Sequence, residues 1–348
     1  MIERKWIFTS FENSWIQQIL DLRFKIFNQK NYSRKRWDWQ YKENPQGNAQ
    51  LALATDKNNQ EILVGHYALM AYKIKYGEEV LSISQSVDTF SSTDFRNQGI
   101  FVGLASIAYE MARNENICGI FGFPNTHSYP GFVKNLDFKV PFSLHFWVKP
   151  VSFGVIFKKL KIPSKIGTFF GIIPLIYPLL NSSFETKEVE SIPEDWEVLQ
   201  RKFEHIFPIC IFRDRTYMLW RYFNCPDRKY KFLKFEKSQE IIGFAVLAIS
   251  NDGYPTGQII DLLVSDLIYT KEFIQTCSWK LKSMGAHTIV TYLHKENLMA
   301  EVYYKLGFSP RGSETKFIFK DLNHIKDFEG FGMTASNWYI SGGDTDYL

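Results

Sequence analysis

The stretch DFRNQGIF, residues 94–101, decides how the first half of the chain is interpreted. Alternating apolar residues before it predict a strand, and apolar residues at helical spacing after it predict a helix. A turn that leads directly into a helix leaves main-chain N–H groups unpaired at the positive end of that helix. Turns that contain Gly also join strands to helices in proteins that bind no anion there. The string contains neither the GxGxxG motif nor a P-loop. The predicted anion site, where Gly99 allows close approach of a pyrophosphate, consists of the amides of Gln98, Gly99, Ile100 and Phe101.

Outward from this stretch, the first 150 residues read as an α/β unit. A helix is predicted at 14–28, followed by an antiparallel meander of three strands at 50–56, 62–76 and 79–90. After the turn come a helix, a strand, a short helix and a closing strand. The same order returns from about residue 187, and the similar strings WQYKENP and WRYFNCP begin at Trp39 and Trp220. One order met twice predicts a duplicated fold.

Composition narrows the function class. The 348 residues are 45% apolar and 22% charged, which is typical of a folded protein with a core. Lys and Arg exceed Asp and Glu by only 41 to 37, so no nucleic-acid partner is implied. The four cysteines form no CxxC pair, which argues against a metal site and disulfides and favours the reducing cytoplasm. The basic N-terminus lacks the apolar core of a signal peptide.

The segment 151–186 is predicted to be an apolar connector. Its run GTFFGIIPLIYPLL at 167–180 has 14 residues, too few for the roughly 18 that a membrane span needs, so no stable membrane insertion is expected. A peripheral membrane contact, helped by upstream lysines, is the less favoured alternative.

With these motifs in hand, the chain resembles the GNAT superfamily of CoA-dependent N-acyltransferases, whose signature is Arg/Gln-x-x-Gly-x-Gly/Ala. Arg96 and Gly99 match it, whereas Phe101 replaces a small residue. A second family element, an Asn followed by a small residue, an aromatic residue and Leu-Gly-Phe, is matched by NLMAEVYYKLGF at 297–308. The first half keeps its spacing from Asn125, but it has Asp-Phe in place of Gly-Phe.

The resemblance implies an α/β fold with a mixed sheet, built from two tandem GNAT-like units. The expected domains are a CoA-binding unit at 1–150, the connector at 151–186, and a degenerate unit at 187–348 that shapes the acceptor site. In the second half, DLLVSDLIYTKEF lacks Arg-x-x-Gly and places Asp266 where phosphate would bind, which opposes an anion. One acyl-CoA per chain, in the first half, is therefore expected, and no metal.

In the family, the third meander strand bonds pantetheine and the thioester through its exposed backbone, and the resemblance implies Asp88 to Ser92 for that segment here. Asp88 is the first candidate for the general base. Two alternatives are that His66 is the base and that Asp88 has only a structural role, bonding nearby main-chain groups. Tyr129 is the candidate that protonates the CoA thiolate, with His127 as its rival. The resemblance implies the following cofactor-binding residues: Phe90, Ser91, Arg96, Asn97, Gln98, Gly99, Ile100, Phe101 and Asn125.

Chains of this kind also resemble enzymes that N-acylate a nucleotide-linked amino sugar of the dTDP-3-amino-3,6-dideoxyhexose type for surface polysaccharides, with acetyl-CoA or 3-hydroxybutyryl-CoA as donor. The absence of an acidic run and the cluster of Arg213, Arg215, Arg221, Arg228 and Lys229 favour an anionic acceptor. Two alternatives stay open: a noncatalytic acyl-CoA-binding or regulatory protein, and a GNAT enzyme with a peptide or lipid-linked amine acceptor. The oligomeric state is also left open.

Overall fold

The computed structural model describes residues 4–28, 32–152, 182–250 and 255–345. The apolar run at 167–180 lies outside the described residues. Within the described ranges, no helix is both long and apolar enough to cross a bilayer.

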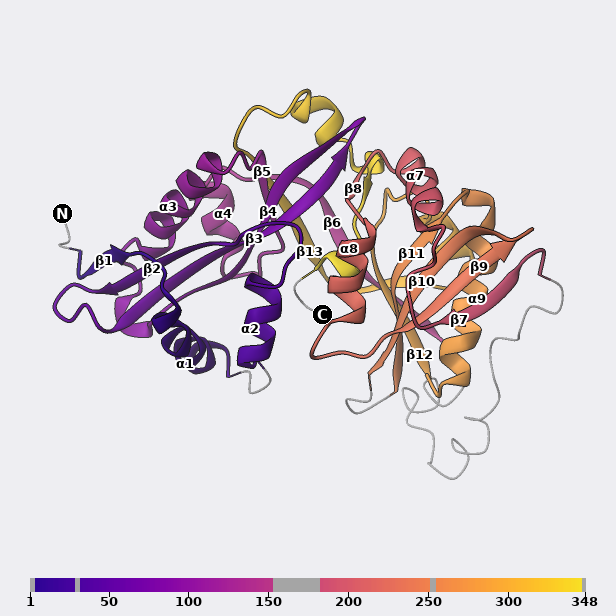
Figure 1. Ribbon diagram of the computed structural model, residues 1–348, viewed down its shortest axis with the longest axis horizontal. Coiled ribbons are helices and arrows are strands. Elements are labelled where there is room, and N and C mark those ends of the chain that lie inside the picture. Colours follow the sequence, from indigo (N-terminus) through magenta and orange to yellow (C-terminus); the bar gives the residue numbers. More distant parts are fainter. Residues whose placement is uncertain (1–3, 29–31, 153–181, 251–254, 346–348) are drawn as a thin grey trace. The chain divides into compact units, whose positions relative to one another are not determined.

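The chain divides into two compact units (Figure 1). Neither unit is a continuous stretch of sequence, because each includes pieces from the other half of the chain. Unit 1 contains Met1–Phe142, Asn224–Arg228 and Lys316–Thr334, and unit 2 contains Ser143–Phe223, Lys229–Thr315 and Ala335–Leu348.

Unit 1 has a mixed sheet with strands in the order β1-β2-β3-β4-β5-β13. Its strands are antiparallel except for the parallel pair β4–β5, and the predicted meander is confirmed as β2, β3 and β4. The strands are β1 (Trp6–Thr9), β2 (Gln50–Asp56), β3 (Leu63–Tyr76), β4 (Glu79–Ser91), β5 (Gly119–Gly122) and the end of β13 (Ser309–Asp321). The helices and turns are η1 (Asn13–Trp15), α1 (Ile16–Phe27), α2 (Arg34–Tyr41), η2 (Thr93–Phe95), α3 (Ile100–Asn114), α4 (Tyr129–Asn135) and η5 (Phe328–Gly332).

Helices α1 and α3 lie on opposite faces of the unit 1 sheet (Figure 1). Small residues on the inner face of α3, such as Ala105 and Ala108, bring that helix close to the strands. The approach is closest at Gly65, where an added Cβ would lie 2.7 Å from the side chain of Ile100. The core of unit 1 is therefore packed tightly at the first turn of α3, which fixes the position of the turn that precedes it.

Unit 2 repeats this topology, with strands in the order β7-β9-β10-β11-β12-β6 and a parallel pair β11–β12. The fold class predicted from the sequence is thereby confirmed. Its strands are β6 (Lys139–Pro150), β7 (Glu185–Val189), β8 (Ile209–Ile211), β9 (Lys231–Lys237), β10 (Glu240–Ser250), β11 (Thr256–Val264), β12 (Thr288–His294) and β14 (Trp338–Tyr339). Its helices and turns are α7 (Trp196–Ile206), α8 (Arg215–Met218), η3 (Leu219–Phe223), η4 (Leu267–Tyr269), α9 (Thr270–Ser283), α10 (Ala300–Lys305), η6 (Ala335–Asn337) and η7 (Gly342–Asp344).

The two closing strands are exchanged between the halves of the sequence. Strand β6, which follows the first half, pairs with β12 of unit 2 from Leu144 to Pro150. Strand β13, which follows the second half, pairs with β5 of unit 1 from Ile318 to Asp321. The Trp147 indole N–H donates to Leu293 O at 2.9 Å, which anchors β6 in unit 2. Repetition in the sequence predicts the strands themselves, whereas their exchange depends on pairing between strands about 140 residues apart (β6 and β12) and about 200 residues apart (β5 and β13).

Candidate active site

The parallel strands β4 and β5 of unit 1 are paired over three residues and then diverge. Their pairing covers Ile83–Gln85 against Gly119–Phe121, although β4 continues to Ser91. Over Ser86–Ser91 the strand pairs with β3 on its other side. We call the edge of β4 from Ser86 to Ser91 that faces away from β3 the unit 1 opening. Unpaired strand edges bond extended ligands through their main-chain groups, so this edge suits a chain with amide groups of its own.

A β-bulge interrupts β4 within the opening. Its register with β3 shifts between the pairs Val87–Ala68 and Phe90–His66, and Asp88 has a positive φ of 46°. A bulge re-aims a side chain, and here the Asp88 carboxylate is bonded by residues of the α1 and α2 region. Asp88 thus lies on the face of the sheet opposite α3.

The Asp88 carboxylate is held by an ion pair and two tyrosines. Arg23 Nε donates to its Oδ1 at 2.9 Å, and the Tyr41 and Tyr32 hydroxyls donate to its Oδ2 at 2.7 and 3.0 Å. Burial alone would raise the pKa of Asp88, but the Arg23 charge and the Tyr41 hydrogen bond outweigh it and lower the pKa below its ordinary value. Asp88 is therefore a stabilised carboxylate and a weak proton acceptor.

His66 lies beside this cluster on β3. Its Nδ1 is 2.7 Å from the main-chain oxygen of Asp88, so in the neutral ring Nδ1 carries the proton and donates it. Its Nε2 is buried and has no hydrogen-bond partner among the described residues. Burial lowers the pKa of His66, and its ring stacks on Phe90 at 4.9 Å. His66 is therefore a neutral imidazole whose Nδ1 is hydrogen-bonded and whose Nε2 has no partner within the described ranges.

The turn predicted from DFRNQGIF leads into α3 as expected. Asn97 and Gly99 both have positive φ values, 60° and 74°, and no side chain caps the helix at Gly99. An added Cβ at Gly99 would meet nothing within 4 Å, so the space in front of the helix is open. The Trp6 indole donates to Gln98 O at 2.9 Å and holds the turn. Arg96 and Asn97 are exposed beside it. This geometry suits a phosphate group.

The large ring of Phe101 fits without crowding the turn. It meets Phe132 of α4 edge to face, with ring centres 5.1 Å apart. Gly131 makes room for it, because an added Cβ there would lie 2.8 Å from the Phe101 ring. The departure from the family's small residue is thus accommodated by α4.

The residues predicted after β5 lie at the start of α4. The Asn125 side-chain oxygen accepts from the main-chain N–H groups of His127 and Ser128 at 3.0 and 2.9 Å, so it caps this turn. His127 is exposed, and Tyr129 packs partly buried against the core on the α3 face. The structure therefore places Tyr129 and Asp88 on opposite faces of the sheet, with β4 between them.

Sequence reasoning missed the partners of Asp88. Arg23, Tyr32 and Tyr41 are 47 to 65 residues away from it along the chain. They carry no motif, and only the packing of α1 and α2 on β4 reveals them.

The matching opening of unit 2 is occupied by the chain itself. Strands β11 and β12 pair over Thr256–Gln258 and Thr288–Val290, and β11 then continues to Val264. The C-terminal segment, Trp338–Thr345, lies against both strands. An added Cβ on its Gly342 would be 3.4 Å from Tyr292 of β12 and 3.5 Å from the main-chain oxygen of Ile260 of β11.

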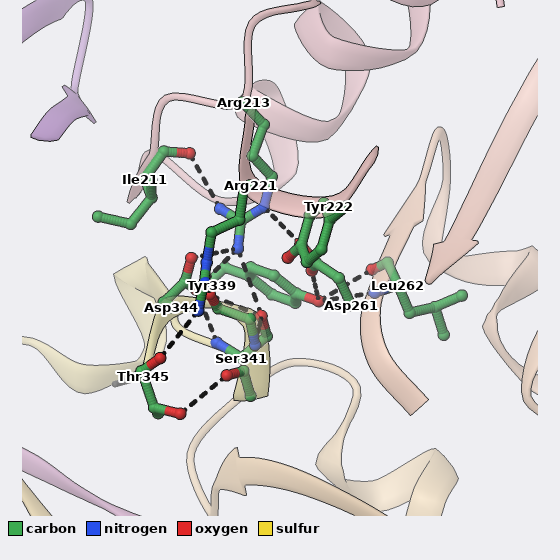
Figure 2. A network of polar contacts seen from close by, with 12 residues as sticks. Ile211, Arg213, Arg221, Tyr222, Asp261, Leu262, Tyr339, Ser341, Asp344 and Thr345 are labelled. Atoms are coloured by element: carbon green, nitrogen blue, oxygen red, sulfur yellow. Dashed lines mark hydrogen bonds and ion pairs between the residues drawn. The ribbon is translucent and has the colours of Figure 1, made fainter. Parts of the chain in front are cut away.

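Hydrogen bonds fix this segment to β11 (Figure 2). The Tyr339 hydroxyl accepts from Leu262 N at 3.0 Å and donates to the Asp261 carboxylate at 2.8 Å. Tyr339 thus bonds main-chain groups of β11 beyond the end of its pairing with β12. Arg221 donates to the main-chain oxygens of Gly343 and Thr345 at 2.8 and 2.9 Å and holds the end of the segment.

A buried ionic network holds the same segment (Figure 2). Arg213 is bonded to Asp261 at 2.9 Å and to Asp344 at 2.7 Å, and all three side chains are at most 1% exposed. Burial alone would lower the pKa of Arg213, but the two carboxylates raise it well above its ordinary value. The arginine therefore carries a permanent charge that bridges β11 and the C-terminal segment.

Asp266 gives the second difference between the units. Its carboxylate accepts from Ile268 N at 2.9 Å and caps η4, the turn that leads into α9. The turn before α9 thus carries a negative side chain that bonds a main-chain N–H group of its own turn, whereas no side chain caps α3. The described part of the chain holds no group of three His, Cys, Asp or Glu residues suited to a metal ion.

Comparisons with known proteins agree with this topology. No protein-family model and no curated protein matches the chain. Among solved structures, a probable N-acyltransferase of unknown function from Enterococcus faecalis matches with a TM-score of 0.66 at 10% identity, covering 91% of this chain and 73% of that one. The chain has the GNAT fold. A GCN5-related N-acetyltransferase from Anabaena variabilis matches with a TM-score of 0.66 at 10% identity, over 93% of this chain and 75% of that one.

A third neighbour carries a bound acyl-CoA. The N-myristoyltransferase of Saccharomyces cerevisiae, solved with myristoyl-CoA, matches with a TM-score of 0.62 at 10% identity, over 92% of this chain and 83% of that one. At these identities the likeness concerns the fold alone.

Proposed function

We propose that the chain is a CoA-dependent N-acyltransferase that binds acyl-CoA in unit 1. The observation that carries the proposal is the combination of the unit 1 opening with the open turn at Gly99. An edge of unpaired main-chain groups suits pantetheine, and the N-terminal end of α3 suits the pyrophosphate. The structural neighbours are named as N-acyltransferases, and one of them binds myristoyl-CoA.

The reaction needs alignment and a route for two protons. The amine nitrogen attacks the thioester carbonyl carbon, the C–S bond breaks, and an amide and the CoA thiolate form. The nitrogen loses one proton to a base, and the thiolate takes one from an acid. Tyr129, or its rival His127, stays the candidate for the acid at the α4 end of the site.

Two groups of unit 1 are candidates for the base, Asp88 and His66. The Asp88 carboxylate is engaged by Arg23 and two tyrosines, whereas His66 Nε2 has no partner within the described ranges. We assign His66 as the base and Asp88 as the residue that positions it, through the bond from His66 Nδ1 to the Asp88 main-chain oxygen. The alternative is that Asp88 itself takes the proton, and the pH profile of kcat/KM distinguishes the two groups.

For the acceptor, we propose the amine of a nucleotide-linked amino sugar of the 3-amino-3,6-dideoxyhexose type. The sequence resemblance and the lack of an acidic run support this choice. The arginine cluster no longer does. Arg213 and Arg221 are buried and bonded within unit 2, and Arg215 donates to Pro193 O. These three arginines therefore do not support the anionic acceptor that their cluster predicts from the sequence.

The test is thiol release from acetyl-CoA with a panel of amines. The panel contains dTDP-, UDP- and GDP-linked amino sugars, the free sugars and peptides with free N-termini. Turnover with a nucleotide-linked sugar, and competition by dTDP or UDP alone, support the proposed acceptor. Turnover only with peptides replaces it with a peptide acceptor. If CoA binds but no amine is acylated, the chain is a noncatalytic acyl-CoA-binding protein.

A further inference from the structure

Gln85 stands at the last position where β4 pairs with β5, at the closed end of the unit 1 opening. Its neighbours across the sheet are Met70 of β3 and Phe121 of β5. All three side chains are buried, and Gln85 is 0% exposed. A long polar side chain is uncommon at such a position.

Neither atom of the Gln85 amide has a hydrogen-bond partner among the described residues. The serines on either side of it differ. Ser84 Oγ donates to Gln50 Oε1 at 3.3 Å, and Ser86 Oγ donates to Tyr67 OH at 2.9 Å. A buried polar atom without a partner costs about 1–3 kcal/mol, so native proteins seldom leave both ends of an amide unpaired. The free amide indicates that something else bonds it.

The surroundings of Gln85 limit what that can be. Phe121 packs against Tyr72 at 5.2 Å and Phe317 at 6.0 Å, and Phe317 stacks on Phe142 at 4.6 Å. These rings fill the same face of the sheet beyond Gln85. A group that reaches the amide from the opening must therefore be short.

We propose that Gln85 binds the acyl group of the donor and selects a short acyl chain that carries a hydroxyl. The inference rests on the proposed function, which puts the pyrophosphate of acyl-CoA at α3 and its acyl end toward the closed end of the strands. A hydroxyl both donates and accepts, so one hydroxyl satisfies the amide oxygen and the amide nitrogen together. A site built for a hydroxyl discriminates strongly against the analogue that lacks it.

The test compares binding of 3-hydroxybutyryl-CoA and butyryl-CoA by calorimetry, which needs no acceptor. The wild-type protein is expected to bind the hydroxyacyl thioester more tightly, on the order of 10²-fold. Gln85→Met, similar in length and apolar, should reduce that ratio to about 3-fold or less. Gln50→Met is the matched control, because Gln50 is also 0% exposed but its amide is bonded to Asn48 O and Glu115. Its ratio should stay as in the wild type.

A thermal melt without ligand gives an independent reading. Gln85→Met should leave the melting temperature unchanged or raise it, whereas Gln50→Met should lower it because Ser84 and Glu115 lose a partner. A lower melting temperature for Gln85→Met contradicts an unpaired amide. Equal affinity of the wild type for the two thioesters overturns the assignment while leaving acyl-CoA binding intact. No binding of either thioester overturns the proposed function as well.

Discussion

The openings of the two units share one geometry and differ in what occupies it. In both, a parallel strand pair separates after three paired residues, at Gln85 in β4 and at Gln258 in β11. In unit 1 a turn with Gly99 at left-handed φ leads into the next helix, and its front is open. In unit 2 the C-terminal segment lies in the opening, and Asp266 caps the turn.

This difference shows how a duplicated fold can specialise. In the unit 2 opening β11 runs on without pairing to β12, and the hydroxyl of Tyr339 bonds the main-chain groups of Leu262 there. Buried main-chain groups need partners in either case. A ligand supplies them in one unit by our proposal, and a covalently attached segment supplies them in the other. In unit 2 the chain itself thus supplies partners for Leu262 N and O of this edge.

The largest expected effect concerns the ionic network of unit 2. Arg213→Met leaves Asp261 and Asp344 buried without their cation, so the free energy of unfolding should fall by about 3–5 kcal/mol. Urea unfolding followed by tryptophan fluorescence measures it. Arg215→Met is the control, because Arg215 makes one hydrogen bond to Pro193 O, and about 1 kcal/mol or less is expected. A loss below about 1 kcal/mol for Arg213→Met would show that the network does not hold the segment.

The next effect sharpens the contrast at the turn before the helix. Gly99→Asp places a carboxylate where the pyrophosphate is expected and should weaken CoA binding on the order of 10²-fold or more. Gly99→Ala adds a Cβ at the same positive φ but adds no charge. Because that Cβ meets nothing within 4 Å, the loss of CoA affinity should be much smaller. Titration calorimetry with CoA measures both. Equal affinity of Gly99→Asp and wild type places the anion site elsewhere.

The proton route gives a kinetic effect of similar size. His66→Gln should lower kcat on the order of 10²-fold with the best amine of the panel, while Tyr32→Phe, which removes one bond to Asp88, should lower it by less than about tenfold.

The pH profile decides between the two bases. Burial lowers the pKa of His66, so the ring stays neutral at pH 7, and kcat/KM should begin to fall only below its ordinary value of 6.5. A profile that stays flat down to about pH 4, with His66→Gln nearly as active as wild type, would restore Asp88 as the base, since its pKa lies below 3.8.

A smaller loss of stability tests whether the C-terminal segment, Trp338–Thr345, is held in the unit 2 opening by Tyr339. Tyr339→Phe keeps the ring but removes the hydroxyl that joins Leu262 N to Asp261, so a loss of about 1–3 kcal/mol in unfolding free energy is expected. CoA affinity should not change, because the variant lies in unit 2. Tighter or additional CoA binding by Tyr339→Phe would indicate that the unit 2 opening still accepts the cofactor.

The sequence predicted much of this because repeats and turns are local signals. The meander, helices α1 and α3 and the turn at Gly99 follow from periodicity and from residues close together in the chain, whereas α2 was not predicted. The exchange of β6 and β13 does not, since it depends on pairing between strands in opposite halves of the sequence. For the same reason the sequence places Arg213 in a cluster that favours an anionic acceptor, although Asp261 and Asp344, 48 and 131 residues away, hold it in a buried ion pair.

The central claim is that acyl-CoA occupies the opening of unit 1 and not that of unit 2. Hydrogen–deuterium exchange with and without saturating CoA tests it directly, because bound pantetheine protects the strand edge that it bonds. Protection is expected over Ser86–Phe101, on the outer edge of β4 and the turn before α3. No change is expected over Ile259–Tyr269, which Tyr339 and Asp266 already engage. CoA-dependent protection of Ile259–Tyr269, or none over Ser86–Phe101, would contradict the claim.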